Sequence, residues 1–278
     1  MRVSAATLET FYATRLGRAA AERLNQRLVD LWGPCQGLSV LGLGFALPLL
    51  SPWQASARAC IGAVPTEIGE TRHEGPRGGM LVSCADDRLP FNDGVFDRIV
   101  LLHAIEEADN PRQVLREAWR VLAPEGRLVV AAANRRSLWS LDDGNPFGHG
   151  RPWTRSQLIG YLSDSLFQVS ASTTAVHMPP LNWSIITAAA RSWERVGEIV
   201  TPGLGGVVLV EAVKRLYAKH GGSAAATVTD AVKASKGRAA LPRKEAALDK
   251  RIPITSPAFD AKVPADKPEA MQSMEPGK

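Results

Sequence analysis

Apolar segments alternate with segments of helical spacing along most of the chain. Runs bounded by Gly, Pro or Asp predict strands, and they cover residues 38–43, 59–64, 80–84, 97–102 and 126–133. The clearest helical pattern is 110–126, where Pro111 stands in the predicted first turn and Pro124 and Gly126 end the pattern. This alternation is typical of a mostly parallel sheet covered by helices.

Further elements are predicted at both ends of this alternation. Residues 5–31 have apolar side chains at three- and four-residue intervals, which predicts an amphipathic helix, a candidate lid or packing helix. After residue 150, the pattern predicts a helix, a strand, a helix and a closing strand at 154–167, 168–176, 181–200 and 205–218. The expected fold class is α/β, with a doubly wound, mostly parallel seven-stranded sheet and an antiparallel edge.

The C-terminal segment differs from the rest in composition. Residues 219–278 are rich in Ala, Pro, Lys and Ser and carry a single aromatic residue, Phe259. Such a segment cannot bury enough apolar surface to offset its chain entropy, so a disordered basic tail is predicted. From Gly221 onward there are 10 Lys and Arg and 7 Asp and Glu, so the tail holds +3 of the net +5. The remainder is nearly neutral, so nucleic acid is not an expected partner; a basic tether is the alternative role of the tail.

The cysteines and the apolar runs indicate the compartment. Cys35, Cys60 and Cys84 are an odd number, lie far apart and form no C-x-x-C pair, so they are expected to be reduced and mostly buried. No N-terminal signal pattern is present, and no apolar stretch reaches the roughly 20 residues that span a bilayer. A cytoplasmic protein without a membrane span is expected.

Residues 89–134, LPFNDGVFDRIVLLHAIEEADNPRQVLREAWRVLAPEGRLVVAAAN, carry a specific family pattern. They resemble the fourth strand, the following helix and the fifth strand of class I S-adenosylmethionine-dependent methyltransferases with a type 11-like domain. A narrower resemblance over 9–220, through FYATRLGR, VLGLGFALP and PFGHGRPWTRSQL, is to a bacterial group of methyltransferase-domain proteins of uncharacterised substrate with a divergent first motif. It implies a Rossmann-like domain, S-adenosylmethionine as cofactor, and methyl transfer to an unknown, small-molecule acceptor.

The resemblance also implies a division of the chain. Residues 1–218 are expected to form the methyltransferase-like domain, followed by the tail at 219–278. Within that domain, 1–34 is a helical lid segment, 35–176 is the cofactor-binding core, and 177–218 supplies a C-terminal helix and the closing strand. Ligands of open parallel sheets bind at the carboxyl ends of the strands, so the site is expected there.

The first motif departs from the family pattern hhD-h-G-x-G-x-G. Gly42 takes the position of the acid that supports the amino acid end of the cofactor, Gly44 keeps its glycine, and Ala46 and Pro48 replace the later two. Phe45 in this loop either stacks on a ligand or packs against the protein, which would leave the loop closed and empty. The first motif is therefore weakened.

The acids that would contact the nucleoside are also displaced. The ribose-binding acid expected after the second strand is absent until Glu67, and the adenine-facing acid is shifted by one residue, so Asp86 either substitutes for it or caps a turn. His103 follows the fourth strand. It either lines the cofactor pocket or has the hydrogen bonds of its ring satisfied by backbone groups. The candidate cofactor residues are Gly42, Gly44, Phe45, Asp86, Asp87 and His103.

Polar residues near the fifth strand are the candidate acceptor site. Loops on a rigid scaffold often carry specificity, and the candidates are Asn134, Arg135, His149 and Arg151, with Tyr12 as a residue that closes over the site. The alternatives are an ordered connection with structural hydrogen bonds and, for Tyr12, a place in the core. No catalytic residue is identified, and the sequence has no metal-spaced His/Cys set, P-loop Lys, H-E-x-x-H or G-x-S-x-G.

Two functions remain open from the sequence. One is methyl transfer, which needs mainly alignment and exclusion of water because the sulfonium already activates the methyl group. The other is a non-catalytic, methyltransferase-like binding or regulatory protein with a degenerate cofactor site. The fold alone does not distinguish them.

Overall fold

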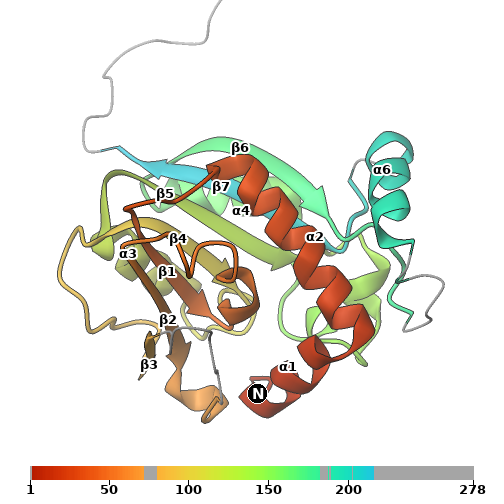
Figure 1. Cartoon of the computed structure of the whole chain (residues 1–278), viewed down its shortest axis with the longest axis horizontal. Helices are drawn as coiled ribbons and strands as arrows, with labels where there is room; N and C mark the ends of the chain where they lie inside the picture. Colours follow the sequence, from red (N-terminus) through yellow and green to blue (C-terminus); the bar gives the residue numbers. More distant parts are fainter. Residues whose placement is uncertain (1, 72–79, 182–186, 188, 202, 216–278) are drawn as a thin grey trace, which may run out of the picture. The chain divides into compact units, whose positions relative to one another are not determined.

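A seven-stranded sheet forms the centre of the part of the chain that this computed structural model describes, residues 2–71, 80–181, 187, 189–201 and 203–215 (Figure 1). Its strand order is β3-β2-β1-β4-β5-β7-β6. The strands are β1 (Ser39–Gly44), β2 (Ala59–Pro65), β3 (Met80–Cys84), β4 (Phe96–Leu102), β5 (Leu122–Ala133), β6 (Phe167–Ala175) and β7 (Val207–Lys214). The first five are parallel, and β7 pairs antiparallel with β5 and β6. The predicted fold class is confirmed.

Helices cover both faces of this sheet, which explains why β1 and β7 are buried along their whole length. The helices α1 (Ala5–Ala13) and α2 (Arg15–Trp32) contribute to the apolar core on one face. The helices α3 (Pro111–Val121) and α4 (Arg155–Asp164) contribute to the core on the other face. The helix α6 (Ala190–Val200) contacts α2.

The predicted N-terminal helix is two helices, so the prediction of one continuous element is wrong. Thr14 has extended backbone angles, and its hydroxyl accepts a hydrogen bond from the amide of Gly17 at 2.9 Å, as an N-cap residue does. A Cβ on Gly17 would lie 2.1 Å from the carbonyl oxygen of Phe11. The chain therefore bends at Thr14 so tightly that only glycine fits at 17, and α1 can lie across the strand ends.

The connection from β1 to β2 also differs from the expected pattern of a helix between strands. It contains only the 3-10 turn η1 (Leu47–Leu49) and a series of turns, anchored by Trp53, whose indole NH donates to the carbonyl oxygen of Gly33 at 3.1 Å. Leu47 lies over β2, because a Cβ on Gly62 would meet its Cδ2 at 2.3 Å. No α-helix begins at the carboxyl end of β1 in the described residues 45–58.

Several predictions concern the ends of the chain or its surroundings. The described part of the predicted 181–200 helix begins at Ala190, and the predicted tail, 219–278, lies outside the described residues. Cys35, Cys60 and Cys84 are free thiols, of which Cys35 is buried. Among the described residues, no helix is long and apolar enough to cross a membrane, and no His, Cys, Asp and Glu side chains form a group that could hold a metal ion.

Candidate functional site

The turn after β1 is fixed onto the end of β4. Gly44 has a φ of +80°, and a Cβ at this position would lie 2.4 Å from the carbonyl oxygen of Leu102. The amide of Phe45 donates to the same oxygen at 2.8 Å. Glycine is required at 44 for both its backbone angle and this close approach.

The space beside Gly42 is occupied by apolar side chains. A Cβ on Gly42 would lie 3.0 Å from Cδ1 of Leu50 and 3.1 Å from the Cβ of Ala46. These contacts are tighter than ordinary van der Waals contact. An acidic side chain at 42 would therefore have to displace Leu50.

Four rings close the strand ends on the side of β1 and β4, and we call them the aromatic cover: Tyr12, Phe45, His103 and Phe147. Phe45 is 2% exposed and stacks on Tyr12 with ring centroids 6.0 Å apart. The hydroxyl of Tyr12 hydrogen bonds Nε2 of His103 at 2.8 Å, and the His103 ring contacts Phe147 at 4.8 Å. Phe45 is therefore packed against protein, and Tyr12 reaches the strand ends from α1.

The polar groups of the aromatic cover are neutral. Burial lowers the pKa of His103 to about 3, with a further decrease from nearby His149, so the imidazole is uncharged at neutral pH. Burial, and then the charge of Glu106, raise the pKa of Tyr12 well above its usual value. The hydrogen bond between Tyr12 and His103 thus joins two neutral groups at a partly buried position.

Glu106 lies beneath this cover. Its Oε1 accepts a hydrogen bond from the amide of Ala133 at 3.0 Å, while its Oε2 is buried and has no partner among the described residues. Burial raises the pKa of Glu106 to about 7. The neighbouring Glu107 accepts a hydrogen bond from the amide of Val3 at 2.7 Å and so holds the N-terminal segment.

Two carboxylates meet at the ends of β2 and β3, and we call Glu67 and Asp86 the acid pair. Nη1 of Arg2 lies 3.1 Å from Oε2 of Glu67 and 2.8 Å from Oδ2 of Asp86. The side chains of Arg2 and Asp86 are largely buried, whereas that of Glu67 is half exposed. Asp87, the adjacent candidate, is exposed on the outside. The backbone thus turns Asp86 inward, toward the same point as Glu67.

The four acceptor-site candidates near β5 lie in a connected set of loops. The Asn134 side-chain amide donates to the carbonyl oxygens of Gly203 and Gly205, at 3.0 and 2.7 Å. Nε of Arg135 donates to the carbonyl oxygen of Pro152 at 3.1 Å. Nε2 of His149 hydrogen bonds the carbonyl oxygen of Asp143 at 3.0 Å, and the amide of Arg151 donates to the carbonyl oxygen of Glu106 at 2.8 Å. Asn134 has no free amide hydrogen left for an acceptor, while the Arg151 guanidinium is exposed.

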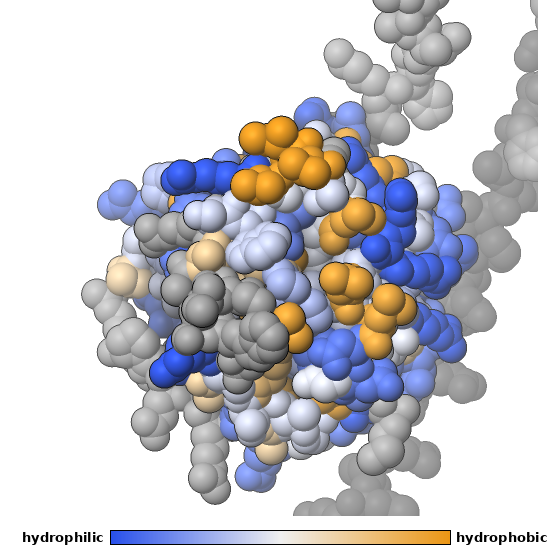
Figure 2. Space-filling view, turned by 90° about the vertical axis from the view of Figure 1, so that its right-hand side faces the viewer, coloured by the Kyte–Doolittle hydropathy of each residue, from blue (hydrophilic) through white to orange (hydrophobic). Residues whose placement is uncertain are grey.

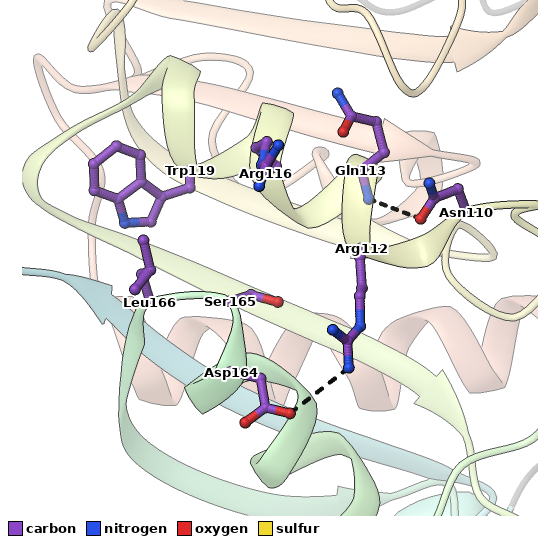
Figure 3. A pocket seen from close by; sticks show the side chains of 8 residues that line it. All are labelled: Asn110, Arg112, Gln113, Arg116, Trp119, Asp164, Ser165 and Leu166. Carbon is purple, nitrogen blue, oxygen red and sulfur yellow. Dashed lines mark hydrogen bonds and ion pairs between the residues drawn. The ribbon is translucent and has the colours of Figure 1, made fainter.

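A separate cavity of about 490 Å³ lies between α3 and the end of α4 (Figure 3). Nη2 of Arg112 and Oδ2 of Asp164 approach each other across it to 3.9 Å, and Asn110 caps α3 at its rim by accepting a hydrogen bond from the amide of Gln113. None of the candidate cofactor residues lines this cavity. It is distinct from the site at the strand ends.

Comparison with known proteins finds similarity over part of the chain. Residues 41–130 match the model of the methyltransferase domain. Over these residues the chain is similar to the class I methyltransferases. A methyltransferase named GfsG from Streptomyces halstedii is 29% identical over 121 residues, which are 40% of this chain and 44% of that protein. A ubiquinone biosynthesis O-methyltransferase from a Caulobacter species is 28% identical over 109 residues, which are 37% and 43% of the two chains. The chain thus spans less than half the length of the curated relatives that it matches.

Solved structures of methyltransferases have the same fold. A Thermotoga maritima S-adenosylmethionine-dependent methyltransferase, described as a possible histamine N-methyltransferase, has a TM-score of 0.54 at 20% identity, covering 74% of this chain and 94% of its own. The geranyl diphosphate C-methyltransferase of Streptomyces coelicolor A3(2), solved with S-adenosyl-L-homocysteine, has a TM-score of 0.50 at 15% identity, covering 69% and 75%. At these identities the likeness concerns the fold.

Sequence reasoning missed two parts of the site at the strand ends. Arg2 is 84 positions away from Asp86, and no local pattern links an N-terminal arginine to that carboxylate. Phe147 lies in PFGHGRPW, a segment whose polar and glycine residues predict an acceptor site but whose ring carries no signal of its own. No local pattern pointed to either residue. The nearest signal was the helical spacing that includes Phe11 and Tyr12, because it predicted an amphipathic helix whose apolar side packs on another part of the chain.

Proposed function

We propose that this protein is an S-adenosylmethionine-dependent methyltransferase acting on a small-molecule acceptor. The observation that carries the proposal is the acid pair: two carboxylates from the ends of β2 and β3 converge on one guanidinium, at the strand ends where ligands of such sheets bind. A ligand with hydroxyl or amino donors could take the place of that guanidinium. The family match over residues 41–130 supports this assignment.

The nucleoside end of the cofactor fits the residues present. Glu67 and Asp86 would accept hydrogen bonds from ribose hydroxyls and from the adenine amino group, because ionised carboxylates are pure acceptors. Arg2 satisfies both carboxylates now, so it must move aside when a nucleoside enters. Its neighbour Val3 is held by one hydrogen bond to Glu107, which makes the N-terminal segment the part that has to move.

The amino acid end of the cofactor fits less well. Gly42 supplies no carboxylate for the ammonium group, and Leu50 and Ala46 fill the space beside it. The loop amides after β1 are available to only a limited extent, because that of Phe45 is already bonded to Leu102. Most of the binding energy would therefore come from the nucleoside end.

The residues of the chain would serve methyl transfer by positioning and by exclusion of water. Bound S-adenosylmethionine supplies a methyl group on a sulfonium, which needs an aligned nucleophile rather than an obligatory acid or metal. Tyr12 and Phe147 would shield the reacting region from solvent, and neutral His103 would offer a hydrogen-bonding nitrogen there. Glu106 would hold the end of β5 through the amide of Ala133.

The rival function is non-catalytic binding or regulation. The packing of Leu50 and Ala46 beside Gly42 favours it, since it closes the position at which the family acid supports the cofactor. The buried position of Phe45 points in the same direction. In this case the acid pair would bind another ligand, or would only anchor Arg2.

Calorimetry with S-adenosylmethionine and S-adenosylhomocysteine tests the proposal. We expect both to bind the full chain, and Arg2→Ala to bind about tenfold more tightly, because the competing charge-assisted contacts are gone. Asp86→Asn should weaken binding by a similar factor. Arg15→Ala, an exposed change on α2, is the matched control and should bind like the parent.

The same titrations can reject the proposal. If the parent and Arg2→Ala keep their fold and neither ligand produces heat at high protein concentration, the donor does not bind and the rival function is favoured. If Arg2→Ala binds more weakly than the parent, Arg2 is a contact residue rather than a competitor. Methyl transfer itself would then be assayed with the variants that bind.

A further inference from the structure

A pocket of about 460 Å³ opens beside the carboxyl end of β5, and we call it the arginine pocket. The amide of Trp153 donates to the carbonyl oxygen of Ala133, the last residue of β5, at 2.8 Å, and the amide of Arg135 donates to the carbonyl oxygen of Trp153 at 3.0 Å. These backbone bonds place the pocket next to the strand ends, where ligands of such sheets bind. Its lining comes from these loops, from the start of α3 and from α4, and includes Pro111, Arg135, Arg151, Trp153, Gly160 and Tyr161.

Two guanidinium groups of the arginine pocket have no counter-charge. Nε of Arg135 donates to the carbonyl oxygen of Pro152 at 3.1 Å, which orients the group and leaves its two Nη atoms without a partner among the described residues. Arg151 is held by its backbone amide, which donates to the carbonyl oxygen of Glu106, and its guanidinium forms no ion pair within the part of the chain that the structure describes. Guanidinium groups with free Nη atoms bind carboxylate oxygens in pairs.

The acid nearest to these groups is engaged elsewhere. Asp164 is the single acid among the described residues that line the arginine pocket. Its Oδ2 lies 3.9 Å from Nη2 of Arg112, which reaches it from α3 across the neighbouring cavity (Figure 3). The two arginines of the pocket therefore keep an excess of positive charge, and an anion is favoured over a neutral or cationic ligand.

Two rings stand beside the guanidinium groups. Trp153 and Tyr161 are both partly exposed, with ring centroids 5.0 Å apart and a tilt of 57°. Cζ of Arg112 lies 5.4 Å from the centroid of the Tyr161 ring and supports it, whereas Nε1 of Trp153 has no hydrogen-bond partner among the described residues. No hydrogen bond thus fixes the Trp153 ring, which can adjust to a flat ligand.

We propose that the arginine pocket binds a planar organic acid, with its carboxylate on the two guanidinium groups and its ring against the two aromatic side chains. A cavity of about 460 Å³ is within the usual size of small-molecule sites and has room for a bicyclic acid. The role of such an acid as the methyl acceptor rests on the proposed function. The binding itself does not, because it needs no cofactor.

The helix α6 offers a second place to which an aromatic probe could bind. It carries exposed apolar side chains, namely Trp193, Val196, Ile199 and Val200. Figure 2 faces the side of the molecule on which α6 lies and shows separate orange groups among blue ones. None of these four residues lines the arginine pocket, so a variant of α6 distinguishes the two places.

Titration of the full chain with three probes, followed by NMR, tests the proposal. The probes are 2-naphthoate, the neutral 2-naphthamide of the same shape, and acetate, which has the charge without the ring. We expect 2-naphthoate to bind at least about tenfold more tightly than either of the others, because it alone engages both the guanidinium groups and the rings.

Substitutions locate the binding. Arg151→Gln and Arg135→Gln should each weaken 2-naphthoate binding by about tenfold and leave 2-naphthamide binding unchanged. Arg116→Gln, an exposed change on α3 beside the neighbouring cavity, is the matched control for charge, and Ile199→Ser on α6 is the control for apolar contact. Both controls should bind 2-naphthoate like the parent.

Several outcomes would overturn the proposal. The parent binds 2-naphthoate no more tightly than 2-naphthamide or acetate; Arg151→Gln, which removes no internal hydrogen bond of the side chain, binds like the parent; or a control loses as much as Arg151→Gln. Displacement of 2-naphthoate by S-adenosylhomocysteine would also overturn it, because the probe would then occupy the cofactor site. If the calorimetry finds no cofactor binding while these titrations succeed, the proposed function fails and the arginine pocket remains.

Discussion

The two halves of the strand-end site are closed in different ways. At the ends of β2 and β3, the acid pair is closed by the guanidinium of Arg2, a charged group that another donor can replace. At the ends of β1 and β4, the aromatic cover is closed by neutral, largely buried rings, with the Tyr12–His103 hydrogen bond between two of them. Opening the first half exchanges polar partners, whereas opening the second exposes apolar surface. A ligand should therefore enter on the side of the acid pair.

The largest expected effect comes from a substitution in the aromatic half. Gly44→Ala places a Cβ 2.4 Å from a backbone oxygen at a φ of +80°, so we expect a loss of about 3 kcal/mol or more in the free energy of unfolding. Gly69→Ala on the acid side is the matched control, since Gly69 has a φ of +92° and open space around it. Its backbone, with a φ of +92° and a ψ of −177°, is one that glycine almost alone adopts, so it should lose about 1–3 kcal/mol from strain, without the additional clash of Gly44→Ala.

Urea unfolding of both variants measures this difference. Equal losses for Gly44→Ala and Gly69→Ala would mean that the turn after β1 can relax away from Leu102. The aromatic half would then be no more rigid than the acid half, and the comparison between them would fail.

The second effect is a pH dependence from Glu106, beneath the aromatic cover. Its pKa is raised from 4.5 to about 7 in the folded chain, so the fold favours the protonated form. Stability should therefore fall as pH rises from about 4.5 to 7, by up to about 3 kcal/mol, and stay flat above. Glu106→Gln should lack this fall, so its stability relative to the parent should improve from pH 5 to pH 8.

Urea unfolding of the parent and Glu106→Gln at both pH values tests this. His103, whose pKa is lowered, destabilises both proteins alike as pH falls from 6.5 toward 3, and so cancels in the difference. If the difference in free energy of unfolding between the two proteins does not change with pH, Glu106 is solvated. The aromatic half of the site would then admit water.

The smallest effect concerns the hydrogen bond in the cover. Tyr12→Phe keeps the ring against Phe45 but removes the 2.8 Å contact to His103, and we expect a loss of about 1 kcal/mol. The control is Tyr161→Phe on α4, where the ring packs on Trp153. This change should leave the free energy of unfolding nearly unchanged. An unchanged stability for Tyr12→Phe, measured by thermal and urea unfolding, would mean that the rings alone hold the cover.

Local patterns predicted the sheet well because each strand has its own apolar run and its own turn signals. The predicted strand at 80–84 matches β3, and that at 59–64 ends one residue short of β2. The helix break at Thr14 was not predicted, because the apolar spacing continues across it and the decisive contact, Gly17 against Phe11, appears only when the two helices meet. The absent helix after β1 was missed because the turn series around Trp53 depends on a distant carbonyl, that of Gly33.

The position of the site could be predicted from the sequence, but the residues that close it could not. Parallel strands bring Gly44, Asp86 and His103 to one edge whatever the loops contain, so these candidates lie at the strand ends. What closes that edge, Arg2 and Tyr12, comes from a segment whose place depends on tertiary packing over more than 80 residues. Roles of individual residues toward a cofactor remain predictions that the binding experiments address.

The packing beside Gly42 also bears on how this chain can change over generations. A single replacement of Gly42 by aspartate would meet the side chains of Leu50 and Ala46, and Leu50 would have to shift to admit the new side chain. Leu50→Ala alone would leave a cavity and gain nothing. Return to the common first motif is therefore easiest when Leu50 also becomes smaller, so we expect positions 42 and 50 to change together.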